Sequence, residues 1–163
     1  MSGDPRVDVE TAAEFFRAAS EFDWTWSAED VDRFRRVVGW EPAEFGTETT
    51  IVMTTNAQLD KPLARFELDG DRIHQVTIHL TDFLDPAAGT TTEFLADVYA
   101  CAGTTLREIL GQPVVQADQP PKSLWDKPTL VGELVALPRN VIGSVIRRDY
   151  PPIVDELQAR GVW

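Results

Sequence analysis

Apolar and polar residues alternate on both sides of an Asp-Gly pair at residues 69–70, within the stretch from Leu63 to Asp85. The alternating apolar positions are Phe66, Leu68, Val76, Ile78 and Leu80. A period of two places these side chains on one face of a strand and the intervening polar ones on the other. Because glycine accepts the positive φ of tight hairpin turns, the stretch predicts a hairpin with one covered face.

Helical periodicity, with apolar residues three and four positions apart, appears in other segments. It predicts helices over residues 9–21, 28–38 and 90–110, and a short closing helix between the prolines at 151–152 and Gly161. Asp8 is expected to cap the first helix. Ser27 with Asp30, and Thr90 with Glu93, resemble capping boxes for the next two.

β-branched residues indicate three more strands, over residues 47–55, 129–137 and 141–148. Residues 112–128 hold four of the eleven prolines without periodicity, so we expect a connecting loop there. The resulting order is ααβββαββα. It predicts one α+β domain over residues 1–163, a two-layer sandwich in which helices cover one face of an antiparallel sheet of about five strands.

The chain carries 27 Asp and Glu residues against 15 Lys and Arg residues, a formal net charge of -12. This acidity repels nucleic-acid phosphates and anionic lipids, and argues against nucleic acid and membrane as partners. It favours a basic protein partner, although it also serves solubility alone. No apolar run approaches the ~20 residues that span a bilayer, and the N-terminus does not resemble a signal peptide, so we expect a cytoplasmic protein.

Residues that commonly bind metals or act as nucleophiles are few. His74 and His79 are the two histidines, and strand alternation sends them to opposite faces. Cys101, the single cysteine, falls on the apolar stripe of the 90–110 helix, where a thiol acts as a small hydrophobe. Because no phosphate, zinc or calcium motif occurs, we expect no metal and no cofactor.

Asp82, Asp85 and Glu93 form the one acidic group suited to acid–base chemistry or to a divalent cation. Asp before a turn and Glu in a capping box have ordinary structural roles, which are the simpler explanation. We therefore expect no catalytic residue, and a protein that is not an enzyme.

Trp24, Trp26 and Trp40 flank the predicted second helix at its two ends. Aromatic side chains at helix ends commonly pack the helix against a sheet. The alternative is an exposed anchor for a protein partner, because Trp is enriched among interface hot spots.

The segments FDWTWSAEDVDRFRRVVGW, VTIHLTDFLDPAAG and LREILGQP together resemble an uncharacterised family of small actinobacterial proteins. That family has a W-x-W-S helix start, a VTDF-like strand end and an ALGEP-like helix exit. The resemblance includes LWDKPTLVGELVAL and covers roughly residues 8 to 160, with HLTDF and LGQP as departures. These motifs concern packing and turns, so they imply a shared fold.

Families of this kind occur beside secreted toxins, so the resemblance implies an immunity protein that occludes the active site of a cognate toxin domain. We expect acidic residues to enter a basic substrate cleft of that partner. The candidate contact residues are Asp82, Asp85, Asp118, Trp125 and Asp126, with the core as the alternative place for Trp125. Two other functions remain open: an acidic secretion chaperone that holds a non-native effector segment, and a small enzyme that uses the acidic group described above.

Overall fold

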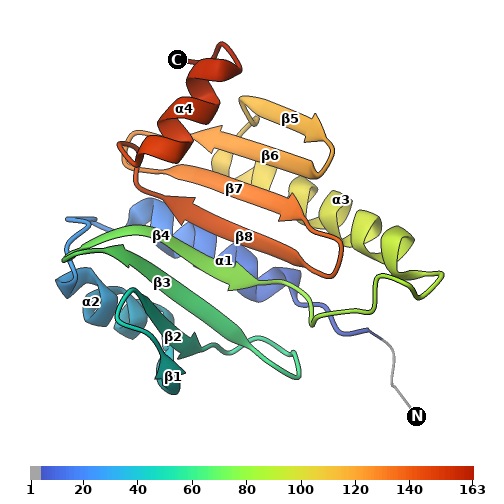
Figure 1. Cartoon of the computed structure of the whole chain (residues 1–163), viewed down its shortest axis with the longest axis horizontal. Coiled ribbons are helices and arrows are strands. Elements are labelled where there is room, and N and C mark those ends of the chain that lie inside the picture. Colours follow the sequence, from blue (N-terminus) through green and yellow to red (C-terminus); the bar gives the residue numbers. More distant parts are fainter. Residues whose placement is uncertain (1–4) are drawn as a thin grey trace.

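The structure, a computed structural model, describes residues 5–163 as four helices and one eight-stranded sheet (Figure 1). The helices are α1 (Val9–Glu21), α2 (Glu29–Val38), α3 (Thr91–Leu110) and α4 (Pro151–Ala159). The strands are β1 (Glu41–Gly46), β2 (Thr50–Thr54), β3 (Leu63–Asp69), β4 (Arg72–His79), β5 (Val115–Asp118), β6 (Pro121–Asp126), β7 (Val131–Ala136) and β8 (Val141–Ile146). The α+β class is correct, but five strands and the order ααβββαββα are wrong: the order is ααββββαββββα.

Neighbouring strands follow the order β1-β2-β3-β4-β8-β7-β6-β5, and every pair is antiparallel. The first four strands and the last four form two meanders, which meet where β4 pairs with β8. The predicted hairpin is β3–β4, whose Gly70 has a φ of 66°. It therefore lies inside the sheet and connects β1 and β2 to the second meander.

The sequence pattern missed β1, β5 and β6; β1 and β6 contain proline, and β5 lies between Pro113 and Pro120. Pro42 lies on β1, which is an edge strand, and Pro121 is the first residue of β6. Proline is tolerated at edges and at strand starts because its missing N–H removes no ladder bond there. The expected loop over residues 112–128 is therefore the β5–β6 hairpin.

Helices cover both faces of the sheet, which corrects the expected two-layer arrangement (Figure 1). α1 and α3 approach one face closely: a Cβ at Gly143 would come within 2.7 Å of the Phe16 ring, and one at Gly132 within 3.2 Å of Leu110. On the opposite face, α4 packs in a separate apolar cluster made of Val115, Leu124, Val131, Ile146, Ile153 and Leu157.

The tryptophans around α2 pack in the core. Trp26 and Trp40 are buried, and Trp24 is partly buried against the same core. Trp24 stacks on Trp26 with ring centroids 4.4 Å apart, and Trp40 stacks on Phe15 at 5.6 Å. The packing interpretation is therefore the correct one for these side chains.

Asp8 caps α1 as predicted, because its Oδ1 accepts a hydrogen bond from Thr11 N–H at 2.9 Å. The capping box predicted at Ser27 is wrong, since α2 follows an N-cap residue, Ala28, that makes no side-chain cap bond. The buried Asp30 carboxylate instead accepts bonds from the backbone N–H groups of Thr25 (2.7 Å) and Trp26 (2.8 Å). It thereby ties the preceding segment to the first turn of α2.

α3 has the predicted bounds but differs from the prediction in two details. Thr90 makes no side-chain cap bond, and Cys101 is exposed rather than on the buried stripe. Within residues 5–163, no helix combines the length and apolar character needed to cross a membrane.

Candidate functional site

The antiparallel register divides the five predicted contact residues between two ends of the sheet. The C-terminal ends of β4 and β5 lie at the same end of the sheet, because four antiparallel pairings, through β8, β7 and β6, separate these two strands and they therefore run in the same direction. Asp82 and Asp85 follow β4 and Asp118 ends β5, so these three share one end. Trp125 and Asp126 finish β6 at the opposite end.

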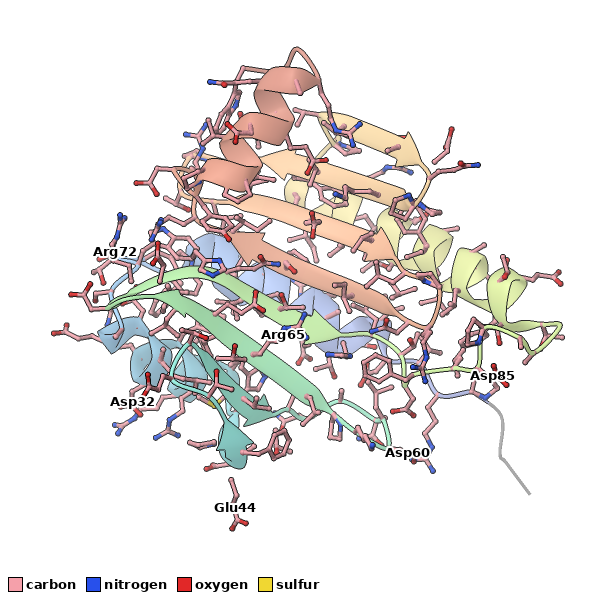
Figure 2. The ribbon with its side chains drawn as sticks, in the orientation of Figure 1. Asp32, Glu44, Asp60, Arg65, Arg72 and Asp85 are labelled. Atoms are coloured by element: carbon pink, nitrogen blue, oxygen red, sulfur yellow. The ribbon has the colours of Figure 1, made fainter. Side chains whose placement is uncertain are left out.

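Asp82 and Asp85 both have local structural contacts. The two oxygens of Asp82 accept bonds from the backbone N–H groups of Asp60 and Lys61, each at 3.1 Å. Asp85 Oδ1 accepts a bond from Ala87 N–H at 2.9 Å, and Asp85 remains exposed. Figure 2 shows Asp60 and Asp85 at one end of the molecule, away from Arg72. Asp82 thus orders the β2–β3 connection, whereas Asp85 leaves a free oxygen toward solvent.

Trp125 lies in the interior, and Asp126 contacts the C-terminal segment. Trp125 is 1% exposed, and its Nε1 donates to the Gly111 carbonyl at 2.8 Å. Asp126 accepts a bond from Trp163 Nε1 at 2.9 Å and forms an ion pair with Arg148 at 2.8 Å. These contacts hold the end of the chain against β6.

An apolar cavity of about 390 Å³ opens at the end that carries Asp118. Three separate segments form its walls: Leu95 and Ala96 come from α3, Pro120 comes from the β5–β6 turn, and Leu137 comes from the β7–β8 turn. Asp118 lies on its rim. The volume falls in the range of ~300–1,000 Å³ that is typical of ligand pockets.

Asp118 lines this cavity, and three further exposed acidic residues lie on segments that reach the same end; we call the group formed by Asp85, Glu93, Asp97 and Asp118 the acidic end. Glu93 and Asp97 are exposed neighbours of the cavity-lining residues on α3, and the Asp85 carbonyl accepts a bond from Thr91 Oγ1 at 2.7 Å. The acidic end thus extends from the first turns of α3 to the turn between β5 and β6.

Few basic residues offset this charge. Residues 81–121 contain six acidic residues and one Lys or Arg, Arg107, which lies in the last turn of α3. Arg139, beside the cavity wall, stands over the Phe83 ring at 5.7 Å, and its Nε donates to the Leu84 carbonyl at 3.3 Å. The charge count along the sequence is a signal that would have extended the predicted site to Glu93 and Asp97.

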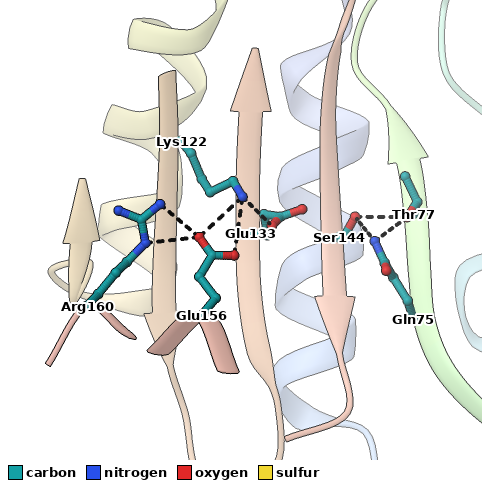
Figure 3. A network of polar contacts seen from close by, with 7 residues as sticks. All are labelled: Gln75, Thr77, Lys122, Glu133, Ser144, Glu156 and Arg160. Atoms are coloured by element: carbon teal, nitrogen blue, oxygen red, sulfur yellow. Dashed lines mark hydrogen bonds and ion pairs between the residues drawn. The ribbon is translucent and has the colours of Figure 1, made fainter. Parts of the chain in front are cut away.

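A second polar group connects α4 to the sheet (Figure 3). Lys122 Nζ lies 3.3 Å from both carboxylate oxygens of Glu156 and 3.6 Å from Glu133. Burial raises the pKa of Glu133, and the neighbouring Lys122 opposes that shift. Arg160 pairs with Glu156 at 2.9 Å. This group fastens α4 over β6 and β7.

The same view shows a row of uncharged polar side chains between β8 and β4 (Figure 3). The hydroxyl groups of Ser144 and Thr77 lie 2.8 Å apart, and Gln75 Nε2 donates to Ser144 Oγ at 3.1 Å. Ser144 and Thr77 are fully buried. These bonds satisfy polar groups within the sheet.

The acidic group considered for catalysis does not form a metal cluster. Asp82 is held by backbone N–H groups, whereas Glu93 lies exposed on α3. In the part of the chain that the structure describes, no three or more His, Cys, Asp or Glu side chains are grouped so as to hold a metal ion.

A family model with the description "family of unknown function (DUF6301)" matches residues 10–145, which is most of the chain. The chain belongs to this family. The DUF6301 match contains α1 to α3, the strands up to β7 and every wall of the cavity, and it confirms the resemblance to an uncharacterised family. No curated protein and no solved structure matches the DUF6301 chain.

Proposed function

We propose that this protein is an immunity-type inhibitor that binds a cognate secreted toxin domain and occludes its active site. The observation that carries the proposal is the acidic end, where Asp118 lines an apolar cavity and the exposed Glu93 and Asp97 directly follow lining residues of α3. An apolar centre with a charged rim is the usual anatomy of a protein–protein interface. The proposal retains actinobacterial origin and a toxin neighbour from the family resemblance, and a cytoplasmic site of action from the expected lack of a signal peptide.

The charge distribution suggests which toxin would fit. A nuclease or an NAD-consuming enzyme binds an anionic substrate in a basic cleft, and the acidic end complements such a cleft. The formal net charge of -12 would also speed association with a basic partner at low salt. The proposed contact residues are therefore Asp85 and Asp118, which the sequence already predicts, together with Glu93 and Asp97.

The test is capture of the partner from native host lysate by the full chain, at low and at high salt. The captured protein is then purified, identified, and assayed for enzymatic activity with and without this chain. We expect a folded, basic enzyme that loses its activity at equal molarity and binds more slowly at high salt. Capture of a non-native effector segment would contradict the proposal and favour the chaperone, and no partner at either salt would also contradict it.

A charge-matched pair of variants locates the interface. Glu93→Gln, Asp97→Asn and Asp118→Asn together neutralise three carboxylates at the acidic end, and we expect about a tenfold lower association rate. The control combines three exposed residues near α2, in Glu21→Gln, Asp23→Asn and Glu29→Gln. This region is joined to the β3–β4 turn by the bond from Ala28 N–H to the Asp71 carbonyl, far from the acidic end. Equal effects of the two variants would exclude the acidic end as the interface.

A further inference from the structure

We infer that the cavity beside α3 is a binding site for an apolar group that carries a positive charge, such as an aromatic or long aliphatic residue flanked by Lys or Arg in a protein partner. The biological partner in this inference rests on the proposed function. The chemical preference of the cavity does not, and it is testable without that partner.

The walls of the cavity offer apolar contacts from rigid elements. Leu95 is 3% exposed and Ala136 is 7% exposed, so both are held in the packed core while facing the cavity. Pro120 and Leu137 close the other sides from the β5–β6 and β7–β8 turns. Filling such a cavity removes apolar surface from water, which stabilises a bound apolar group by ~25 cal/mol per Å².

The charge at the rim selects a cation over an anion. Asp118 lines the cavity directly, and Asp97 follows the lining residue Ala96 on α3. Two features act in the opposite sense. Arg139 follows the lining residue Pro138, but its guanidinium is held over the Phe83 ring. The N-terminus of α3 also carries a partial positive charge that favours anions. The effect of the helix N-terminus fades within the first turn, where Glu93 already lies. The positive group is therefore expected near Asp97 and Asp118, away from the helix start.

The alternatives within this chain fit less well. A second copy would bring another formal charge of -12 to an acidic rim, and like charges oppose that association. The C-terminal Trp163, an exposed aromatic residue, is held at the opposite end of the sheet by its bond to Asp126. A protein partner that presents an apolar residue flanked by Lys or Arg fits both the apolar walls and the acidic rim of the cavity.

The experiment uses three small probes with the same phenylbutyl body: 4-phenylbutylamine, 4-phenylbutanol and 5-phenylpentanoate. Each is titrated into the full chain at neutral pH, and backbone amide NMR signals are followed. We expect the amine to shift the signals of Thr92, Leu95 and Ala96, with a Kd on the order of 1 mM for so small a ligand. The alcohol should bind about fivefold more weakly than the amine, and the anion more weakly still.

Variants on the exposed side of α3 connect the shifts to the cavity. Ala96→Trp fills the cavity from its exposed wall and should abolish binding of the amine, whereas Thr104→Trp, two turns further along, should leave it unchanged. Asp118→Asn should remove most of the preference for the amine over the alcohol. The inference is overturned by no shift with any probe, by binding of the anion equal to that of the amine, or by an Ala96→Trp chain that binds like the wild type. None of these results alters the outcome of the partner capture, so the two proposals fail separately.

Discussion

His79 is a buried histidine whose pKa the structure lowers well below its ordinary value. Burial, reinforced by the nearby Arg65 guanidinium, lowers the pKa of His79 to about 4, while the Asp82 carboxylate opposes the shift. Arg65 Nη1 lies 3.4 Å from Nε2, and Asn140 Nδ2 lies 3.3 Å from Nδ1. The folded chain therefore holds a neutral imidazole at neutral pH.

This pKa predicts that the free energy of unfolding falls in mild acid. The ordinary pKa of histidine is 6.5, so between pH 6.5 and about 4 the unfolded chain binds a proton at His79 that the folded chain does not. Stability should be constant above that window and should decrease by about 2 kcal/mol between pH 7 and pH 5. Urea unfolding followed by tryptophan fluorescence at several pH values measures this slope.

Glutamine at position 79 provides the control, because its amide bonds to the same neighbours without titrating. His79→Gln should remove most of the slope between pH 7 and pH 5. His74, the other histidine, also has a lowered pKa because of burial, and it contributes with the same sign. A slope that His79→Gln leaves unchanged would show that His79 does not hold the proposed charge state.

The environment of His74 shows what sequence alternation misses at the residue scale. Glu67 pairs with Gln75 and Leu68 pairs with Ile73, so His74 is the extra residue of a β-bulge. The bulge shifts the alternation by one position, and His74 stacks on Tyr150 beside α4. The prediction that the two histidines lie on opposite faces is therefore wrong, since a single bulge reverses the pattern.

At the scale of elements, helices are predictable here because their signals are local. The Asp8 cap and the three- and four-residue apolar spacing give α1 its observed bounds, and Gly111 ends α3 where predicted. The missed strands depend on their neighbours: β1 has mostly exposed residues, and β5 has four residues. The strands they pair with stabilise β1 and β5, and such pairing leaves no periodic pattern in a short stretch of sequence.

The contact between α1 and β8 makes a prediction about glycine. An alanine at Gly143 would place Cβ 2.7 Å from Phe16 Cε2, so Gly143→Ala should displace α1 and lower the free energy of unfolding by about 1–3 kcal/mol. Gly103 is the matched control, because it lies inside α3 with no atom within 4 Å of an added Cβ. Gly103→Ala should raise stability by about 0.5–1 kcal/mol through helix propensity. Thermal or urea unfolding of both variants tests this, and a neutral Gly143→Ala would mean that the layers are less tightly packed.

At the scale of the molecule, the sequence indicates the charges of the candidate site but not its shape. Asp85 and Asp118 were identified from turn-rich, acidic segments, and the fold brings them to one end. Trp125 and Asp126 lie in the same proline-rich segment as Asp118. Because β6 is six residues long, they lie at the opposite end of the sheet. Three segments that are distant in the sequence form the walls of the cavity, so the cavity can be recognised only when the order of the strands is known.

The uneven distribution of charge predicts how salt affects the stability of the molecule. With a formal net charge of -12, the folded chain repels itself, and NaCl screens that repulsion. The thermal midpoint should therefore rise between about 10 and 200 mM NaCl. Asp97→Asn relieves repulsion at the acidic end, so it should raise the midpoint at low salt and reduce the salt response.

Asp32→Asn makes the same change in net charge in a different setting. Asp32 pairs with Arg35 at 2.7 Å and with Arg36 at 3.0 Å on α2, so its loss should lower the midpoint at low salt. Differential scanning calorimetry of both variants at low and high salt separates the two effects. If both substitutions raised the midpoint equally, net charge alone would govern stability, and the acidic end would not be a local concentration of repulsion that a basic partner could relieve.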